Sequence, residues 1–167
     1  MAKLEKNHKS REARERLSIR NPLHWLATGF GSGLAPVAPG TFGTLAAIPF
    51  YWFLADLPIS VFCAIIVIAS IAGIWICNSA TKAIGQPDHG SIVWDEFVGL
   101  WITMIAVPKS WLWIAVGFLV FRFFDIIKPW PIRWFDRYVK GGLGIMIDDI
   151  VAGIFGWLTM QVILYFF

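Results

Sequence analysis

The stretch IDDIVAGIFGWLTMQVILYFF, residues 147–167, decides the fold of this chain. Beyond its two carboxylates it contains no charged residue, and an α-helix needs about 20 mainly apolar residues to cross a bilayer. Because an ionised carboxylate in hydrocarbon costs several kcal/mol, we expect Asp148 and Asp149 to face other polar groups and to serve a function. The stretch therefore predicts a membrane helix that begins at a functional site.

The composition of the whole chain agrees with a membrane protein. Of its 167 residues, 57% are hydrophobic and 15% are charged, and the mean hydropathy is +0.66. An average soluble domain carries about 25% charged residues. The basic excess is concentrated in residues 1–20, which contain seven Lys or Arg and three Glu, so nucleic-acid binding is not indicated. We expect a basic cytosolic tail over residues 1–20 and a single membrane domain over residues 21–167.

Apolar segments precede the last one at residues 42–54, 61–80, 91–107 and 111–127. We therefore expect an all-α, polytopic membrane helical bundle with about five membrane segments. The first segment is short and contains Pro49, so the loops must decide whether it crosses. Loops rich in Lys and Arg favour the cytoplasm. Five crossings with a cytoplasmic N-terminus place every basic-rich loop inside, whereas four crossings would place two of them outside.

This topology brings five acidic residues to the cytoplasmic face. Asp95 and Glu96 lie near the start of the third segment, Asp125 at the end of the fourth, and Asp148 and Asp149 at the start of the fifth. Either adjacent pair alone is also explained as helix N-terminal acids that face the helix dipole. Crowded carboxylates repel one another unless a cation lies among them, and Mg²⁺ prefers oxygen ligands that it shares with phosphate. The five acids together therefore predict a magnesium site.

Two basic residues and a Pro-Gly-Thr turn could bind phosphate beside such a metal. Arg122 and Lys128 flank Asp125 at three-residue steps, so the three side chains share a helical face. The alternative is a ladder of charged side chains that reach from a helix end to the membrane surface. Thr41 and Thr44 lie where a helix starts, and free backbone N–H groups at helix starts bind phosphate.

Three further polar residues lie in the loops. Asp88 precedes the third segment and faces the same side as the acids, so we expect it to contribute to substrate binding. His89 beside it is either a general acid or base or a loop histidine without a role. Asp136 lies in the 128–145 loop, outside the helix-end cluster, and we expect its replacement by Asn to be nearly silent.

Four motifs, in order, resemble those of the phosphatidylglycerophosphatase A family of bacterial membrane lipid phosphatases. They are APVAPGTFGTLAAIP (35–49), DHGSIVWDEFVGLW (88–101), FRFFDIIKPWPI (121–132) and GGLGIMIDDIVAG (141–153). The resemblance implies Mg²⁺-dependent hydrolysis of phosphatidylglycerophosphate to phosphatidylglycerol, a step of phospholipid biosynthesis. It also implies a multi-pass protein of the bacterial cytoplasmic (inner) membrane whose active site faces the cytoplasm.

Carried over by position, the resemblance assigns roles to individual residues. We expect Asp95, Asp125 and Asp149 to be catalytic, and we expect Mg²⁺ to be bound by Asp95, Glu96, Asp125, Asp148 and Asp149. The substrate would be held by Lys128, Arg122, Thr41, Thr44 and Asp88. A metal-positioned water would attack phosphorus with a carboxylate as general base, and a covalent aspartyl-phosphate route is the weaker alternative because no DxDx[TV] motif is present.

Rival functions make different demands on the same acids. A transporter would use them as a cation or proton relay, but the outer halves of the segments carry almost no polar residues. The DG…AR…G…D…D pattern of a CDP-alcohol phosphotransferase is absent. A purely structural membrane subunit would have no use for five clustered acids. The sequence leaves open which acid is ligand and which is base, the number of metal ions, and the oligomeric state.

Overall fold

The computed structural model describes residues 15–18, 20–86 and 89–167, and regular structure within these ranges is entirely helical. The elements are α2 (Pro22–Ala27), η1 (Ser32–Leu34), α3 (Pro39–Leu54), α4 (Ile59–Ile84), α5 (Trp94–Thr103), α6 (Trp111–Ile127), α7 (Ile132–Tyr138) and α8 (Gly141–Phe166). The predicted all-α class is confirmed for the described part of the chain. Most of the expected tail, residues 1–20, lies outside the described residues.

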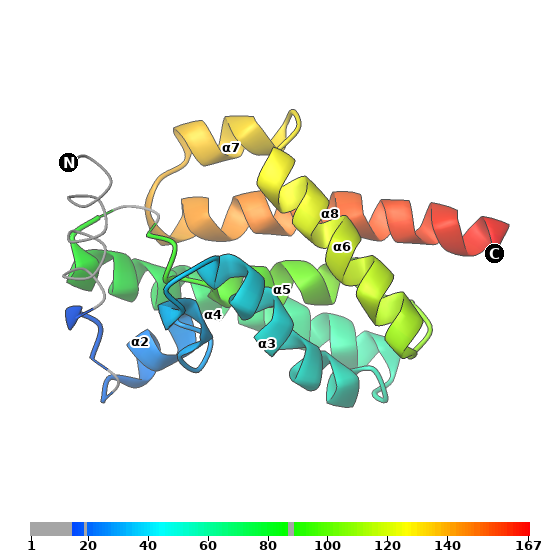
Figure 1. Ribbon diagram of the computed structural model, residues 1–167, viewed down its shortest axis with the longest axis horizontal. Helices are drawn as coiled ribbons and strands as arrows, with labels where there is room; N and C mark the ends of the chain where they lie inside the picture. The colour runs from blue at the N-terminus through cyan, green and yellow to red at the C-terminus, as the bar shows by residue number, and fades with distance from the viewer. Residues whose placement is uncertain (1–14, 19, 87–88) are drawn as a thin grey trace.

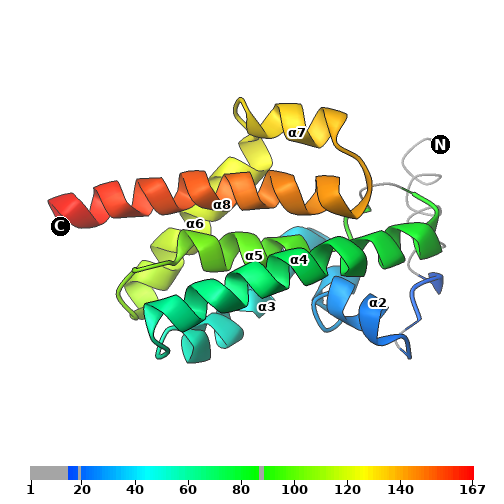
Figure 2. The same ribbon diagram turned by 180° about the vertical axis from the view of Figure 1, so that it is seen from behind.

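The short helix α5 lies at the centre of the bundle. It packs against α3, α4, α6 and α8, and α4 and α8 run along the length of the molecule on either side of it (Figures 1 and 2). Every residue from Asp95 to Thr103 is buried. Two indole N–H groups of α5 donate to backbone carbonyls of its neighbours, Trp94 Nε1 to Ala69 O and Trp101 Nε1 to Ala47 O, both at 3.2 Å.

Small residues let α8 approach α5 closely. A Cβ atom on Gly153 would lie 2.6 Å from the backbone oxygen of Gly99, closer than real Cβ atoms come to other atoms. The hydroxyl of Thr103 donates to Gly99 O at 3.0 Å and to Gly153 O at 3.3 Å. This close contact is of the small-residue kind that packed membrane helices use. It holds α8 against α5 close to Asp149, whose backbone oxygen would lie 3.0 Å from a Cβ added at Gly99.

Two helices in the described residues are long and apolar enough to cross a membrane, α4 and α8, with 26 residues each. The five-segment expectation is therefore met only in part, because α3 has 16 residues and α6 has 17. The expected third segment, residues 91–107, was too long. Its helix α5 has ten residues, or about 15 Å at 1.5 Å per residue, which is half the hydrocarbon thickness. The chain leaves the helix after Thr103, and Ala106 has a φ of 58°.

The other predicted segments agree better with the helices that the structure contains. The first begins at Pro39 and continues through Pro49 as one helix. The last begins at Gly141, six residues before the predicted start. At one end of the bundle Lys109 Nζ lies 2.5 Å from Asp56 Oδ2, so the α3–α4 and α5–α6 loops are together there. The starts of α3, α5 and α8 and the end of α6 lie toward the opposite end.

Candidate active site

The site is built around the first turn of α5, where Asp95 and Glu96 are each only 9% exposed. Both acids belong to a helix that is surrounded by other helices, and Asp95 Oδ1 and Glu96 Oε2 are buried. The start of α3 packs directly against Glu96. A Cβ on Gly40 would overlap Glu96 Oε1 and lie 3.2 Å from Arg122 Nη1, and a Cβ on Gly43 would overlap Glu96 Oε2. At Gly40 the close atom is the end of a flexible side chain that can move aside, whereas at Gly43 the added carbon would also lie 2.5 Å from Val93 Cβ, so packing favours glycine there.

Arg122 joins α5 to the end of α6. Its Nη1 atom lies 3.4 Å from Glu96 Oε1 and also forms a very short ion pair with Asp125 Oδ2. The three side chains are between 12% and 14% exposed. Buried charges of this kind are stable only when paired and hydrogen-bonded. Of the three residues expected to share a helical face, Arg122 and Asp125 pair with each other, Lys128 pairs elsewhere, and Glu96 joins Arg122 from another helix.

Lys128 makes a second ion-pair bridge. Its Nζ atom lies 2.5 Å from Asp148 Oδ2 and 2.7 Å from Asp136 Oδ1. Lys128 ends α6 in the left-handed conformation, with a φ of 46°, which turns the chain toward α7. Burial lowers the pKa of the Lys128 ammonium, but attraction by Asp148 and hydrogen bonds to Asp136 and Asp148 outweigh it, so this pKa lies above its ordinary value. The side chain therefore stays positively charged.

The placement of Asp136 outside the cluster was wrong. Asp136 lies on α7, and its carboxylate contacts the same lysine that holds Asp148. Eight residues separate Lys128 from Asp136, and they are not on one continuous helix, so helical periodicity gave no signal of the contact. Asp136 is the polar residue of this site that sequence reasoning missed.

Asp149 is the most enclosed of the five predicted metal ligands that the structure brings together. It is 3% exposed, and its Oδ2 atom is buried without a hydrogen-bond partner in the described residues. The carboxylates that repel it are, in order, those of Asp125, Asp95, Asp148 and Glu96. The other four acids that the sequence assigned to one membrane face therefore lie within electrostatic reach of Asp149.

The chemistry of these donors fits a hard divalent cation. All are carboxylate oxygens, the ligands that Mg²⁺ prefers, and Glu96 Oε2 and Asp149 Oδ2 are both buried without a described hydrogen-bond donor. A cation between the acids would satisfy such oxygens. In the described residues, however, no group of three or more His, Cys, Asp or Glu side chains already surrounds a single point, so the carboxyl groups would have to come closer together on binding.

The predicted phosphate-binding residues of α3 occupy different positions. Thr41 is half-buried in the first turn of the helix. Thr44 is completely buried, and its hydroxyl donates to Gly40 O at 2.9 Å, so it supports the turn beside Glu96.

His89 Nδ1 accepts from the backbone N–H of Ser91 at 3.2 Å, which favours a role in shaping the loop. Asp88 lies outside the described residues.

Comparison with known proteins gives a consistent result. The family model described as phosphatidylglycerophosphatase A matches residues 25–164. A protein of Escherichia coli (strain K12) named phosphatidylglycerophosphatase A is 54% identical over 143 residues, which cover 85% of this chain and 83% of that protein. A protein of the same name from Haemophilus influenzae is 46% identical over 153 residues, with 90% and 94% covered. No solved structure gave a significant match.

Proposed function

Because the chain belongs to the phosphatidylglycerophosphatase A family and is a phosphatase, we propose that it hydrolyses the phosphomonoester of phosphatidylglycerophosphate. The products are phosphatidylglycerol and inorganic phosphate. One observation from the structure supports this proposal independently of family membership. Five carboxyl groups and two cationic side chains from α5, α6 and α8 converge at one end of the bundle. The transporter alternative finds no support in the relatives.

The acidic residues are proposed to hold Mg²⁺ and to activate water. Asp95, Glu96, Asp125, Asp148 and Asp149 would be the ligands, and the ion would neutralise charge on the phosphate oxygens. One of these five carboxylates would act as general base instead of ligand and would accept a proton from the attacking water. The oxygen of that water bonds to phosphorus, the bond from phosphorus to the glycerol oxygen breaks, and the glycerol oxygen takes up a proton.

Arg122 and Lys128 are proposed to bind the phosphate group. Guanidinium and ammonium groups form strong charge-assisted hydrogen bonds to phosphate oxygens. In the structure each cation already contacts two carboxylates, Arg122 those of Glu96 and Asp125 and Lys128 those of Asp136 and Asp148. A bound phosphate would compete for these hydrogen bonds, and the carboxylates would then be free to hold the metal. Thr41, in the first turn of α3 beside Gly40, would donate to the same phosphate.

The proposed membrane arrangement follows from the position of the site. With α4 and α8 crossing the bacterial inner membrane, the acids lie where α8 begins. We propose that this end of the bundle faces the cytoplasm, because the basic residues of the 128–145 loop are there. A lipid headgroup at the inner leaflet then reaches the acids while its acyl chains stay in the bilayer.

Phosphate release from phosphatidylglycerophosphate by the purified protein tests the proposal. In mixed detergent micelles with Mg²⁺ we expect release of one phosphate per lipid and formation of phosphatidylglycerol. Excess chelator should stop the release, and added Mg²⁺ should restore it. Absence of phosphate release would overturn the substrate assignment, whereas full activity after extensive dialysis against chelator would overturn only the metal.

A further inference from the structure

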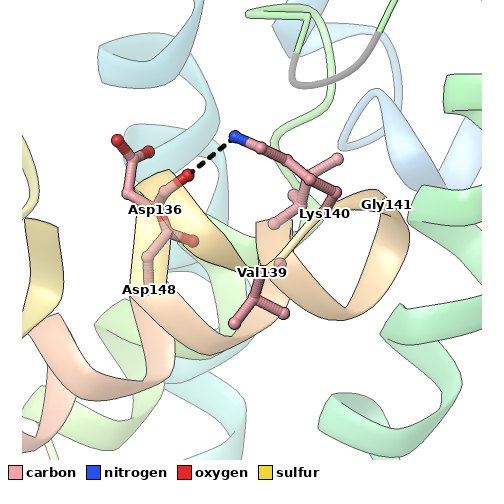
Figure 3. A pocket seen from close by; sticks show the side chains of 7 residues that line it. Asp136, Val139, Lys140, Gly141 and Asp148 are labelled. Atoms are coloured by element: carbon pink, nitrogen blue, oxygen red, sulfur yellow. Dashed lines mark hydrogen bonds between the residues drawn. The ribbon is translucent and has the colours of Figure 1, made fainter. Parts of the chain in front are cut away.

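A pocket separates α7 from the start of α8, next to the acidic cluster. Its volume is about 270 Å³, and Figure 3 shows the residues that line it. They are Asp136, Val139, Lys140, Gly141, Gly144, Ile145 and Asp148. One wall therefore contains Asp148, a proposed metal ligand, and the rim contains Lys140, a residue to which the proposed reaction gives no role.

The carboxylates and the ammonium group that line this pocket have different kinds of hydrogen-bond partner. The carboxylates of Asp136 and Asp148 both contact Lys128. The Lys140 ammonium instead donates to the backbone oxygen of Asp136 at 3.2 Å, as the dashed line in Figure 3 shows. This contact is with a neutral carbonyl, so it leaves the positive charge of Lys140 available to an anion. The side chain is exposed, so an anion can reach it without a change of fold.

The backbone keeps the pocket open between these groups. Gly141 has a φ of 75°, which favours glycine, and a Cβ on Gly144 would overlap the backbone oxygen of Val139. Larger residues at either position would strain the α7–α8 turn or displace it. The pocket is therefore a fixed consequence of how α8 begins.

We propose that this pocket binds the glycerol and the phosphodiester of the substrate headgroup, with Lys140 as the cation that recognises the phosphodiester. The inference rests on the proposed function. Phosphatidylglycerophosphate carries two phosphates joined by a three-carbon glycerol. When the terminal phosphate lies at Lys128 and Asp148, the second phosphate must lie a glycerol length away, and the pocket leads from Asp148 to Lys140. Lys140 is thus a specificity-determining residue, because a lipid with a single phosphate has no group to place beside it.

Binding of two small headgroup analogues to the full-length protein tests this assignment. Glycerol 1,3-bisphosphate contains both phosphates of the headgroup, and sn-glycerol 3-phosphate contains one. In isothermal titration calorimetry with Mg²⁺ in detergent, the wild-type protein should bind glycerol 1,3-bisphosphate at least tenfold more tightly than sn-glycerol 3-phosphate. The reason is that a hydrogen bond to a charged group contributes about 1.5 kcal/mol or more. Lys140→Gln should abolish this preference and leave the affinity for sn-glycerol 3-phosphate unchanged, and Lys140→Arg should retain it.

Arg137→Gln is the matched control. It removes one positive charge from the same region, at an exposed position that does not line the pocket, and should retain the preference for the bisphosphate. The inference is overturned if Lys140→Gln keeps the preference for the bisphosphate or lowers the affinity for both ligands equally. It is also overturned if the wild-type protein binds neither ligand or shows no preference between them. Phosphate release is measured separately. A protein that prefers the bisphosphate but releases no phosphate from the lipid would refute the proposed function and leave the two-phosphate pocket standing.

Discussion

Replacement of Asp125 by Asn separates a role in catalysis from a role in holding Arg122. The substitution keeps the size and polarity of the side chain and removes the charge that a metal ion or a guanidinium requires. Asp125 forms a short ion pair with Arg122 at a site where both side chains are between 12% and 14% exposed. The substitution therefore changes a buried charge pair without creating a cavity.

The expected loss of stability follows from the partners that remain. Breaking a buried ion pair by removing one partner costs about 3–5 kcal/mol when the other charge is left uncompensated. Arg122 keeps Glu96, whose Oε1 lies 3.4 Å from Nη1, and the amide oxygen of the introduced asparagine can still accept one hydrogen bond. We therefore expect a smaller cost, about 1–3 kcal/mol, the range for one hydrogen bond to a charged group. The protein should remain folded.

The expected change in turnover depends on the role of Asp125. If Asp125 binds the metal or activates water, turnover should fall by about 10²-fold or more, which corresponds to about 2.7 kcal/mol of lost transition-state stabilisation. If Asp125 serves only to pair with Arg122, the melting temperature should fall while turnover per folded molecule stays near the wild-type value. The melting temperature should fall in both cases, so the two roles differ in turnover per folded molecule.

The assay is phosphate release per folded molecule, with a thermal unfolding curve for each variant. Asp56→Asn is the matched control, because Asp56 is also paired with a cation, Lys109, but lies at the opposite end of the bundle and is 66% exposed. An exposed pair contributes only about 0–1 kcal/mol, so this variant should retain both activity and stability. Near-wild-type turnover in folded Asp125→Asn would refute a catalytic role for Asp125.

Two further pairs of substitutions test the membrane arrangement and the helix packing. In a background without Cys63 and Cys77, Arg137→Cys should react with an impermeant thiol reagent only from the cytoplasmic side and Leu57→Cys only from the outside; the reverse pattern would contradict the proposed orientation. Gly153→Ala places a Cβ atom 2.6 Å from Gly99 O and should destabilise the protein by about 1–3 kcal/mol, measured by thermal unfolding. Gly90→Ala is the control, because the added carbon there meets only Pro39, at 3.6 Å, and it should change the melting temperature little. If Gly153→Ala and Gly90→Ala are equally stable, the α5–α8 contact is looser than described.

The grouping of the five acids could be predicted because it depends on segment order alone. Each acid lies at the end of an apolar segment, and alternate segment ends meet on the same side. Glu96 and Arg122 illustrate this well, since they come from different helices and contact each other at 3.4 Å. Knowledge of the helix crossing angles was not needed for this prediction.

The extent of the third segment could not be predicted from its composition. Residues 91–107 are apolar almost throughout, but an apolar surface can be covered by other helices as well as by lipid. In α5 the neighbours are α3, α4, α6 and α8, so its hydrophobic residues are buried within the protein. Asp136 was missed for a related reason. Its contact with Lys128 depends on the left-handed turn at the end of α6, a conformation that the surrounding sequence does not specify.

The balance of charge in the site would link substrate binding to the proposed metal. In the described residues, the cluster contains the carboxyl groups of Asp95, Glu96, Asp125, Asp136, Asp148 and Asp149, and the cations that contact them are Arg122 and Lys128. To the extent that these acids are ionised, they repel a phosphomonoester, which is itself an anion. A divalent cation would reverse this repulsion, because it would bind carboxylates and phosphate oxygens at once and free Arg122 and Lys128 for the phosphate. Metal and substrate should therefore bind cooperatively, each strengthening the affinity for the other by the same factor.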